Sequence, residues 1–150
     1  MSGTAGTQRS AQAGIAALAA EMTAHGIERD APPRAVMAML GDRWTHLILL
    51  VLETGEWRHA DLRRVLAQLS AEQAISQRVL TEKLRSLERY GFVQRAVTDH
   101  VPPHVSYRLT EIGQGLVAQS RRTLDWINRH AAQILQARDG FDAQRVGLCI

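Results

Sequence analysis

A run of polar and charged side chains in the middle of the chain has the spacing of one helix face. If residues 76–90 form a helix with Leu80 on its buried side, the opposite face and its flank carry Gln77, Arg78, Thr81, Glu82, Arg85 and Arg89. Arginine binds guanine or phosphate through paired N–H groups, glutamine pairs with adenine, and threonine bonds phosphate or touches the thymine methyl group. Ser76, as the N-cap, leaves backbone N–H groups near an incoming phosphate. These residues predict contacts in a DNA major groove, although a charged outer face is also usual for any solvated amphipathic helix.

The segment directly after this helix favours the DNA-binding interpretation. The pattern changes to a period of two over 93–98 and 105–110, which predicts two strands, and the proline-containing segment 99–104 predicts the turn between them. The resulting β-hairpin would act as a wing that reaches the DNA backbone or the minor groove. Its candidate contacts are Arg95, His100, His104 and Arg108.

Two other kinds of chemistry are weaker interpretations of the same sequence. His100 and His104, with Asp99, also fit part of a metal site, but a structural zinc site normally needs four ligands and no cysteine is near. Solvated wing residues are the favoured account. The sequence has no phosphate-cradling glycine loop, nucleophile elbow or HExxH pair. We therefore expect no enzyme, no metal and no cofactor, with a metal-dependent or hydrolytic enzyme as an outlying alternative.

The charge of the chain is concentrated in the same region. Residues 57–108 carry nine Lys or Arg and five Asp or Glu, a net +4, while the whole chain has a net charge of +3. Positive charge on one part of a chain is typical of a surface that faces phosphates. No apolar run approaches the roughly 20 residues that span a bilayer, so we expect no membrane partner. The single cysteine, Cys149, allows no internal disulfide and fits the reducing cytoplasm.

The elements that would position these residues follow from apolar periodicity and from glycine and proline. Helices are expected over 14–24, 34–40, 44–52, 61–69, 76–90 and 111–137, with Asp42 as a plausible N-cap and residues 57–59 as a strand or an extended link. This order predicts a mainly α fold with a small β-hairpin wing, a winged helix-turn-helix with dimerisation helices at both ends. The expected divisions are a flexible tail 1–12, an N-terminal helix 13–30, the DNA-binding domain 31–110, the dimerisation helix 111–137 and a C-terminal tail 138–150.

Several motifs, in one order, resemble the HxlR family. They are the runs 40–44 (LGDRW), Gly55 with Arg58, 80–88 (LTEKLRSLE), 90–93 (YGFV), 101–107 (VPPHVSY) and 109–113 (LTEIG). Together they cover about residues 31–130. The resemblance implies a dimeric winged-helix regulator related to the MarR group, many of whose members sense electrophiles, oxidants or small aromatic compounds.

The sequence departs from the family pattern in three places. Many redox-sensing members have a Cys-Pro pair ahead of the GDRW motif, whereas Ala31 precedes Pro32 here, and Cys149 is a poor substitute for the missing thiol. His59 stands where the family has an aromatic residue, either as a neutral, satisfied imidazole or as a position that responds to pH or ligand. The joint over 67–74 is longer than the usual turn, which could re-aim the recognition helix.

Two copies are expected because one small module contacts only a few base pairs. The apolar stripe of the terminal helix exceeds what one small domain covers, so we expect it to pair with the same helix of a second copy, assisted by the N-terminal helix. The predicted dimer interface comprises Ile15, Leu18, Met22, Leu116, Leu124, Ile127 and Ile134. The alternative is that the long helix folds back on its own core.

The sequence therefore predicts a cytoplasmic, sequence-specific regulator that binds double-stranded DNA as a homodimer. We expect a repressor modulated by a small, aromatic-type ligand rather than by a cysteine switch. Its candidate pocket residues are Trp44, His46, His59 and Trp126, because aromatic and imidazole groups suit such a ligand. The alternative function is a winged-helix scaffold for protein partners that does not bind DNA.

Overall fold

The computed structural model describes residues 3–71 and 74–148, and the chain divides into two compact units, residues 1–45 and 46–150. The first unit holds α1 (Gly3–His25) and α2 (Pro32–Leu40). Helix α1 has no buried residue and ends at Gly26, whose φ of +95° is accessible chiefly to glycine. The tail predicted over 1–12 is helical from Gly3 onward, through a stretch that contains no proline to interrupt it.

Helix α3 (Arg43–Leu52) begins in the first unit and continues into the second. Its first turn is capped as the sequence predicted. Asp42 Oδ2 accepts hydrogen bonds from the backbone N–H of Thr45 at 2.8 Å and from the Thr45 hydroxyl at 2.9 Å. A carboxylate at this position satisfies N–H groups that the helix itself cannot pair.

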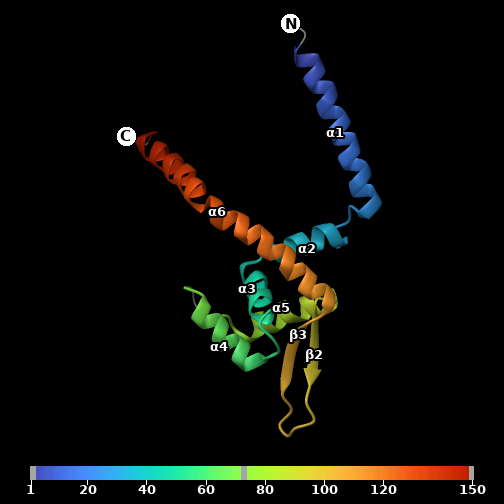
Figure 1. Cartoon of the computed structure of the whole chain (residues 1–150), viewed down its shortest axis with the longest axis vertical. Coiled ribbons are helices and arrows are strands. Elements are labelled where there is room, and N and C mark those ends of the chain that lie inside the picture. The colour runs from blue at the N-terminus through green and yellow to red at the C-terminus, as the bar shows by residue number, and fades with distance from the viewer. Residues whose placement is uncertain (1–2, 72–73, 149–150) are drawn as a thin grey trace. The chain divides into compact units, whose positions relative to one another are not determined.

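The second unit contains the elements that matter for the candidate interface (Figure 1). In chain order they are β1 (Trp57–Arg58), α4 (His59–Leu69), α5 (Gln77–Arg89), β2 (Val93–Val97), β3 (Val105–Leu109) and α6 (Glu111–Leu148). The strands form an antiparallel sheet in the order β1-β3-β2, with Trp57 opposite Tyr107 and Val93 opposite Leu109. Residues 57–58 therefore form a strand rather than an extended link. The β2–β3 hairpin projects from the helices as a wing.

Four helices build the core of this unit. The fully buried side chains are Ile48 and Leu49 on α3, Leu62 and Leu66 on α4, Leu80, Leu84 and Leu87 on α5, and Val117 on α6. On α4 and α5 the spacing of three and four residues places each set on one helix face. The predicted fold class is confirmed: a mainly helical winged helix-turn-helix with a small sheet.

Helix α6 packs on this core only near its beginning. Its buried residues are Gly113, Val117 and Ser120, and none of the described residues after Ser120 is buried. Arg121 ends the packed part with an ion pair to Glu53, with 2.9 Å between Nη2 and Oε1. The predicted helix end at 137 and the tail over 138–150 are wrong for the described residues, because the helix continues to Leu148 through a stretch without proline.

Within residues 3–71 and 74–148, no single helix is both long and apolar enough to cross a membrane. Only α2 and α3, taken together as a bent pair, meet the criteria of length and composition.

Candidate nucleic-acid interface

Helix α5 has defined caps at both ends, which fix the length of the candidate recognition helix. Ser76 is the N-cap, and its hydroxyl accepts a hydrogen bond from the Val79 N–H at 3.1 Å. At the other end, Gly91 has a φ of +81°, its N–H donates to Glu88 O, and the Phe92 N–H donates to Leu87 O, both at 3.0 Å. This pair of bonds is the Schellman motif. The helix predicted over 76–90 is therefore present, with its first and last residues as caps.

The outer face of α5 carries the side chains that the sequence placed there. Leu80, Leu84 and Leu87 point into the core, and this fixes the orientation of the helix. The remaining candidates lie on the solvent side: Gln77, Arg78, Glu82, Arg85 and Arg89 are exposed, and Thr81 is half-buried. The face is thus polar and basic along its whole length.

The arginines on this face are not equivalent. Arg78 Nε lies 3.2 Å from Glu82 Oε1, so its charge is partly offset within the helix. The Arg89 guanidinium lies over the Tyr90 ring, 5.5 Å from the centroid. Arg85 has no hydrogen-bond or ion-pair partner among the described residues. Arg85 is therefore the side chain of this helix most available to an external anion.

The wing residues also differ from one another. Arg95 on β2 is exposed and has no acidic partner in the described part of the chain, whereas Arg108 on β3 donates to Gln94 Oε1 at 2.7 and 3.1 Å. His100 is exposed near the tip, while His104 is half-buried and its ring centroid is 6.2 Å from that of His100. Over the described ranges, no three His, Cys, Asp or Glu side chains come together as metal ligands would.

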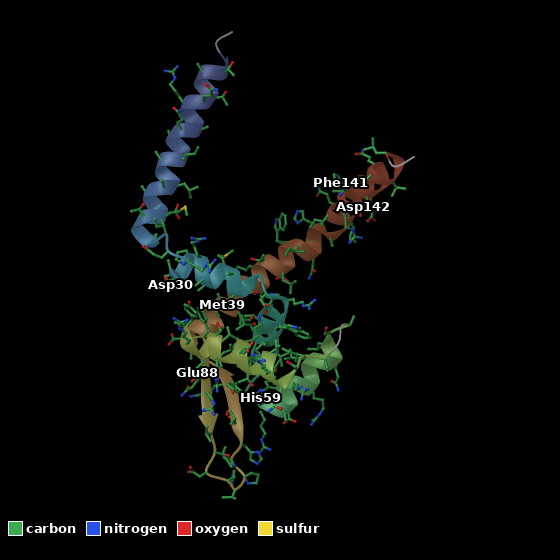
Figure 2. All side chains as sticks on the ribbon, turned by 180° about the vertical axis from the view of Figure 1, so that it is seen from behind. Asp30, Met39, His59, Glu88, Phe141 and Asp142 are labelled. Atoms are coloured by element: carbon green, nitrogen blue, oxygen red, sulfur yellow. The ribbon has the colours of Figure 1, made fainter. Side chains whose placement is uncertain are left out.

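A hollow of about 530 Å³ lies where α5, the wing and the start of α4 meet. Arg58, His59, Ala60 and Asp61 line it from the β1–α4 junction, Gln77, Thr81 and Arg85 from α5, and Arg95, Pro103, His104, Val105 and Tyr107 from the hairpin. Figure 2 labels His59 at this place, at the start of α4 and beside the hairpin. The hollow thus brings together five of the predicted DNA contacts, from both the recognition helix and the wing. The predicted contacts that do not line it are Ser76, Arg78, Glu82, Arg89, His100 and Arg108.

His59 joins α4 to the recognition helix inside this hollow. Its Nε2 lies 3.1 Å from Thr81 Oγ1, and the Thr81 hydroxyl donates to Gln77 O at 2.8 Å. Because that hydroxyl proton is already used, Nε2 is the donor to Thr81. Partial burial, and then the nearby positive charge of Arg63, lower the pKa of His59 below 6.5. This is the environment of a neutral, hydrogen-bonded imidazole.

Of the four predicted pocket residues, only His59 lines this hollow. Trp44 and His46 are half-buried on α3. Trp126 is 52% exposed on α6 and stacks on His130, with ring centroids 4.3 Å apart. The predicted pocket therefore has one residue in common with the hollow.

Sequence reasoning missed Arg58 as a candidate contact. The sequence patterns include it only as part of a motif with Gly55, yet it is exposed, lines the hollow and has no acidic partner within the described residues. An available signal was its position at the junction of β1 and α4, next to His59. A two-residue strand paired with β3 brings such a residue beside the wing.

The residues predicted for a dimer interface are largely accessible. Ile15, Leu18 and Met22 on α1 are exposed, as are Ile127 and Ile134 on α6. Leu116 and Leu124 on α6 are half-buried.

Part of the predicted 67–74 joint is helical. Its first three residues are the last turn of α4, and residues 72–73 lie outside the described ranges, as does Cys149. Arg63 Nε donates to Ile75 O at 3.0 Å, which ties α4 to the chain directly before α5.

Comparisons with known proteins agree on one family. The model of the HxlR-like helix-turn-helix family matches residues 39–134. The helix-turn-helix transcriptional regulator YtfH of Escherichia coli is 35% identical over 108 residues, which are 72% of this chain and 81% of YtfH. The regulator YdeP of Bacillus subtilis is 33% identical over 103 residues, 69% of this chain and 76% of YdeP.

Solved structures give the same result. The putative regulator YtfH of Salmonella typhimurium superposes with a TM-score of 0.62 at 34% identity, covering 75% of this chain and 95% of that one. The reduced form of the transcriptional regulator YodB of B. subtilis has a TM-score of 0.56 at 32% identity, covering 66% and 92%. The region matched by the family model includes α5 and the wing. The chain therefore belongs to the HxlR-like helix-turn-helix family of transcriptional regulators.

Proposed function

We propose that this protein binds specific sites on double-stranded DNA as a homodimer and represses transcription from them. One observation carries the proposal: Arg85 on α5 and Arg95 on the wing line one hollow, and neither has an acidic partner among the described residues. A helix fits the major groove, and a hairpin beside it can follow the backbone. Unpaired guanidinium groups on both elements supply the charge that attracts phosphate.

The distal part of α6 supports the homodimer. Large apolar side chains are exposed there, among them Trp126, Ile127, Ile134, Leu135 and Phe141. Figure 2 shows Phe141 on the distal part of this helix. Large apolar patches on a protein surface mark interaction sites, and a second copy of α6 is the partner that a symmetric regulator provides. Pairing would also supply the second recognition helix that a two-half-site operator requires.

Repression and a noncovalent signal complete the proposal. Repression is proposed because a dimer that occupies a promoter can block transcription without any further contact. A small ligand, rather than a thiol, is the proposed signal because Ala31 occupies the position before Pro32 and Cys149 is the single cysteine. Such a ligand must bind the DNA-competent and incompetent states unequally in order to shift their populations.

The test is binding to the DNA upstream of the protein's own gene, measured by fluorescence anisotropy against a scrambled duplex over a range of salt. We expect specific binding that weakens with salt, and a loss of about 1–3 kcal/mol in Arg85→Ala. Arg78→Ala should lose less, since Glu82 already partly offsets its charge. Arg122→Ala, an exposed change on α6, serves as the matched control.

Sedimentation of the same samples measures the oligomeric state. A folded dimer that binds no duplex at low salt would contradict the DNA-binding proposal and favour the protein-scaffold alternative. Equal binding to the specific and scrambled duplexes at every salt concentration would contradict sequence specificity at that promoter.

A further inference from the structure

The hollow between α5, the wing and the start of α4 has an unbalanced charge. Three arginines line it, Arg58, Arg85 and Arg95, and none has an ion-pair or hydrogen-bond partner among the residues the structure describes. Its acidic member, Asp61, is already bonded to Arg64, with 3.0 Å between Oδ1 and Nη1. Arginines from three different elements therefore line the hollow without an ion-pair partner among the described residues, while Glu88 lines an adjoining hollow with Arg85 and Arg95.

Three other arginines, on α5, β3 and α4, have their donors engaged within the protein, whereas Arg89 and Arg122 have no hydrogen-bond or ion-pair partner among the described residues. Arg78 pairs with Glu82, Arg108 donates to Gln94, and Arg63 donates to the Ile75 carbonyl. Guanidinium groups are permanently positive, so neighbouring ones repel each other, and an anion between them reduces this repulsion and accepts hydrogen bonds from their N–H groups. The fork of an arginine matches two oxygens of a phosphate group.

The remaining polar groups of the hollow are compatible with an anion but do not supply its charge. His59 is held by Thr81, and partial burial with the charge of Arg63 lowers its pKa, so it is neutral near pH 7. His104 is half-buried on the wing. The positive charge at this place therefore resides on the arginines.

We infer that the hollow is a binding subsite for one oxyanion of the phosphate class, with Arg58, Arg85 and Arg95 as its ligands. The inference deepens the proposed function and rests on it for the expected occupant, a phosphodiester group of the DNA backbone. Free phosphate has the same chemistry and is the second source of such an anion. Arg58 thereby joins the DNA-contacting surface from β1, outside both the recognition helix and the wing.

The test uses Arg58→Gln and Arg95→Gln, with Arg122→Gln as a control that removes the same charge from α6 away from the hollow. Binding of the full chain to a scrambled duplex of about 30 base pairs, long enough for two half-sites, is measured against chloride concentration. Each hollow variant should reduce the slope of log affinity against log salt by about 1 for each phosphate that it no longer neutralises. The control should keep the slope of the unsubstituted protein.

A second arm separates the two sources of the anion. Sodium phosphate is titrated into the protein alone, by calorimetry, and into the protein–duplex complex, at ionic strength matched with chloride. We expect phosphate to compete with the duplex more strongly than chloride does, and this difference to disappear in Arg58→Gln. Thermal unfolding of each variant establishes that these exposed substitutions leave the fold intact.

The outcomes distinguish this inference from the proposed function. If the protein binds the duplex but Arg58→Gln and Arg95→Gln keep its slope and its response to phosphate, the subsite is wrong while the regulator proposal stands. If the protein binds phosphate through these arginines but binds no duplex, free anion is the occupant, the subsite stands and the regulator proposal fails. If neither ligand binds, both fail.

Discussion

The two parts of α6 have different relations to the rest of the second unit. From Glu111 to Ser120 the helix is packed on the core, and Gly113, Val117 and Ser120 are buried. From Arg121 to Leu148 no residue is buried, although Trp126, Phe141 and Val146 are large and apolar. The contrast teaches that the winged domain needs only the beginning of α6, and that the apolar residues farther along have no part in this core.

The largest effect is expected from placing charge on the exposed apolar residues of the distal part of α6. Ile127→Glu with Ile134→Glu should prevent self-association, since the two residues are 41% and 45% exposed in one chain and a partner would bury that exposed fraction. Full burial of such a side chain is worth about 1.5–3 kcal/mol, so four half-buried ones per dimer represent roughly 4 kcal/mol, near a thousandfold in the dissociation constant.

Sedimentation over a range of protein concentration measures this effect. Gln136→Glu, which helical periodicity places on the side opposite Ile127, is the control and should leave association unchanged. A double variant that associates as strongly as the unsubstituted protein would show that Ile127 and Ile134 have no role in pairing.

A single added methyl group should disrupt the packing of the first part of α6 against the turn after α5. A Cβ added at Gly113 would lie 2.0 Å from the carbonyl oxygen of Phe92, a backbone atom, so the helix or the turn after α5 would have to move. Gly113→Ala should lower the free energy of unfolding by about 1–3 kcal/mol, as overpacking does. Urea unfolding followed by circular dichroism measures the change.

Gly115 provides the matched control for that substitution. An added Cβ there meets nothing within 4 Å, and the position is inside the same helix. Gly115→Ala should therefore raise stability by up to about 1 kcal/mol, through helix propensity alone. If both variants lost stability equally, close packing at Gly113 would not be the reason.

The smallest predicted effect concerns the junction of α4 with α5. Since the pKa of His59 is lowered in the folded protein, its imidazole binds a proton more readily in the unfolded chain than in the folded one as the pH falls below about 6.5. The stabilisation from the neutral imidazole is complete above about pH 6.5 and is lost as the pH falls toward the folded-state pKa. Unfolding free energy should therefore decrease more between about pH 7.5 and pH 5 in the unsubstituted protein than in His59→Gln. Parallel decreases in both proteins would assign the pH dependence to other groups.

The sequence was sufficient for the elements of the winged domain because local signals agreed there. Ser76 and Gly91 mark the two ends of α5, and the change from a period near 3.6 to a period of 2 located the hairpin. The ends of the outer helices were not predictable in this way. Residues 3–12 and 138–148 have neither apolar periodicity nor proline, so nothing local distinguishes a helix from a tail.

The candidate site was predicted less completely than the fold. The face of α5 followed from one buried leucine, but the availability of each arginine depends on its neighbours in space. Only the partner of Arg78, at Glu82 one turn away, could have been anticipated from spacing. Arg58 comes into the hollow through the pairing of β1 with β3, a contact between residues about 50 positions apart that no local pattern contains.

Three hydrogen bonds made by Thr110 connect the end of the recognition helix to the beginning of α6. Thr110 N–H donates to Phe92 O at 3.0 Å, its hydroxyl donates to Gly91 O at 2.5 Å, and the same hydroxyl accepts from Gly113 N–H at 3.1 Å. The turn that ends α5 and the turn that begins α6 thus form one rigid elbow. If two copies pair through α6 as proposed, a rotation of one α6 against the other would change the distance between the two recognition helices, and the angle at which the long helices cross would then set the half-site spacing of the operator.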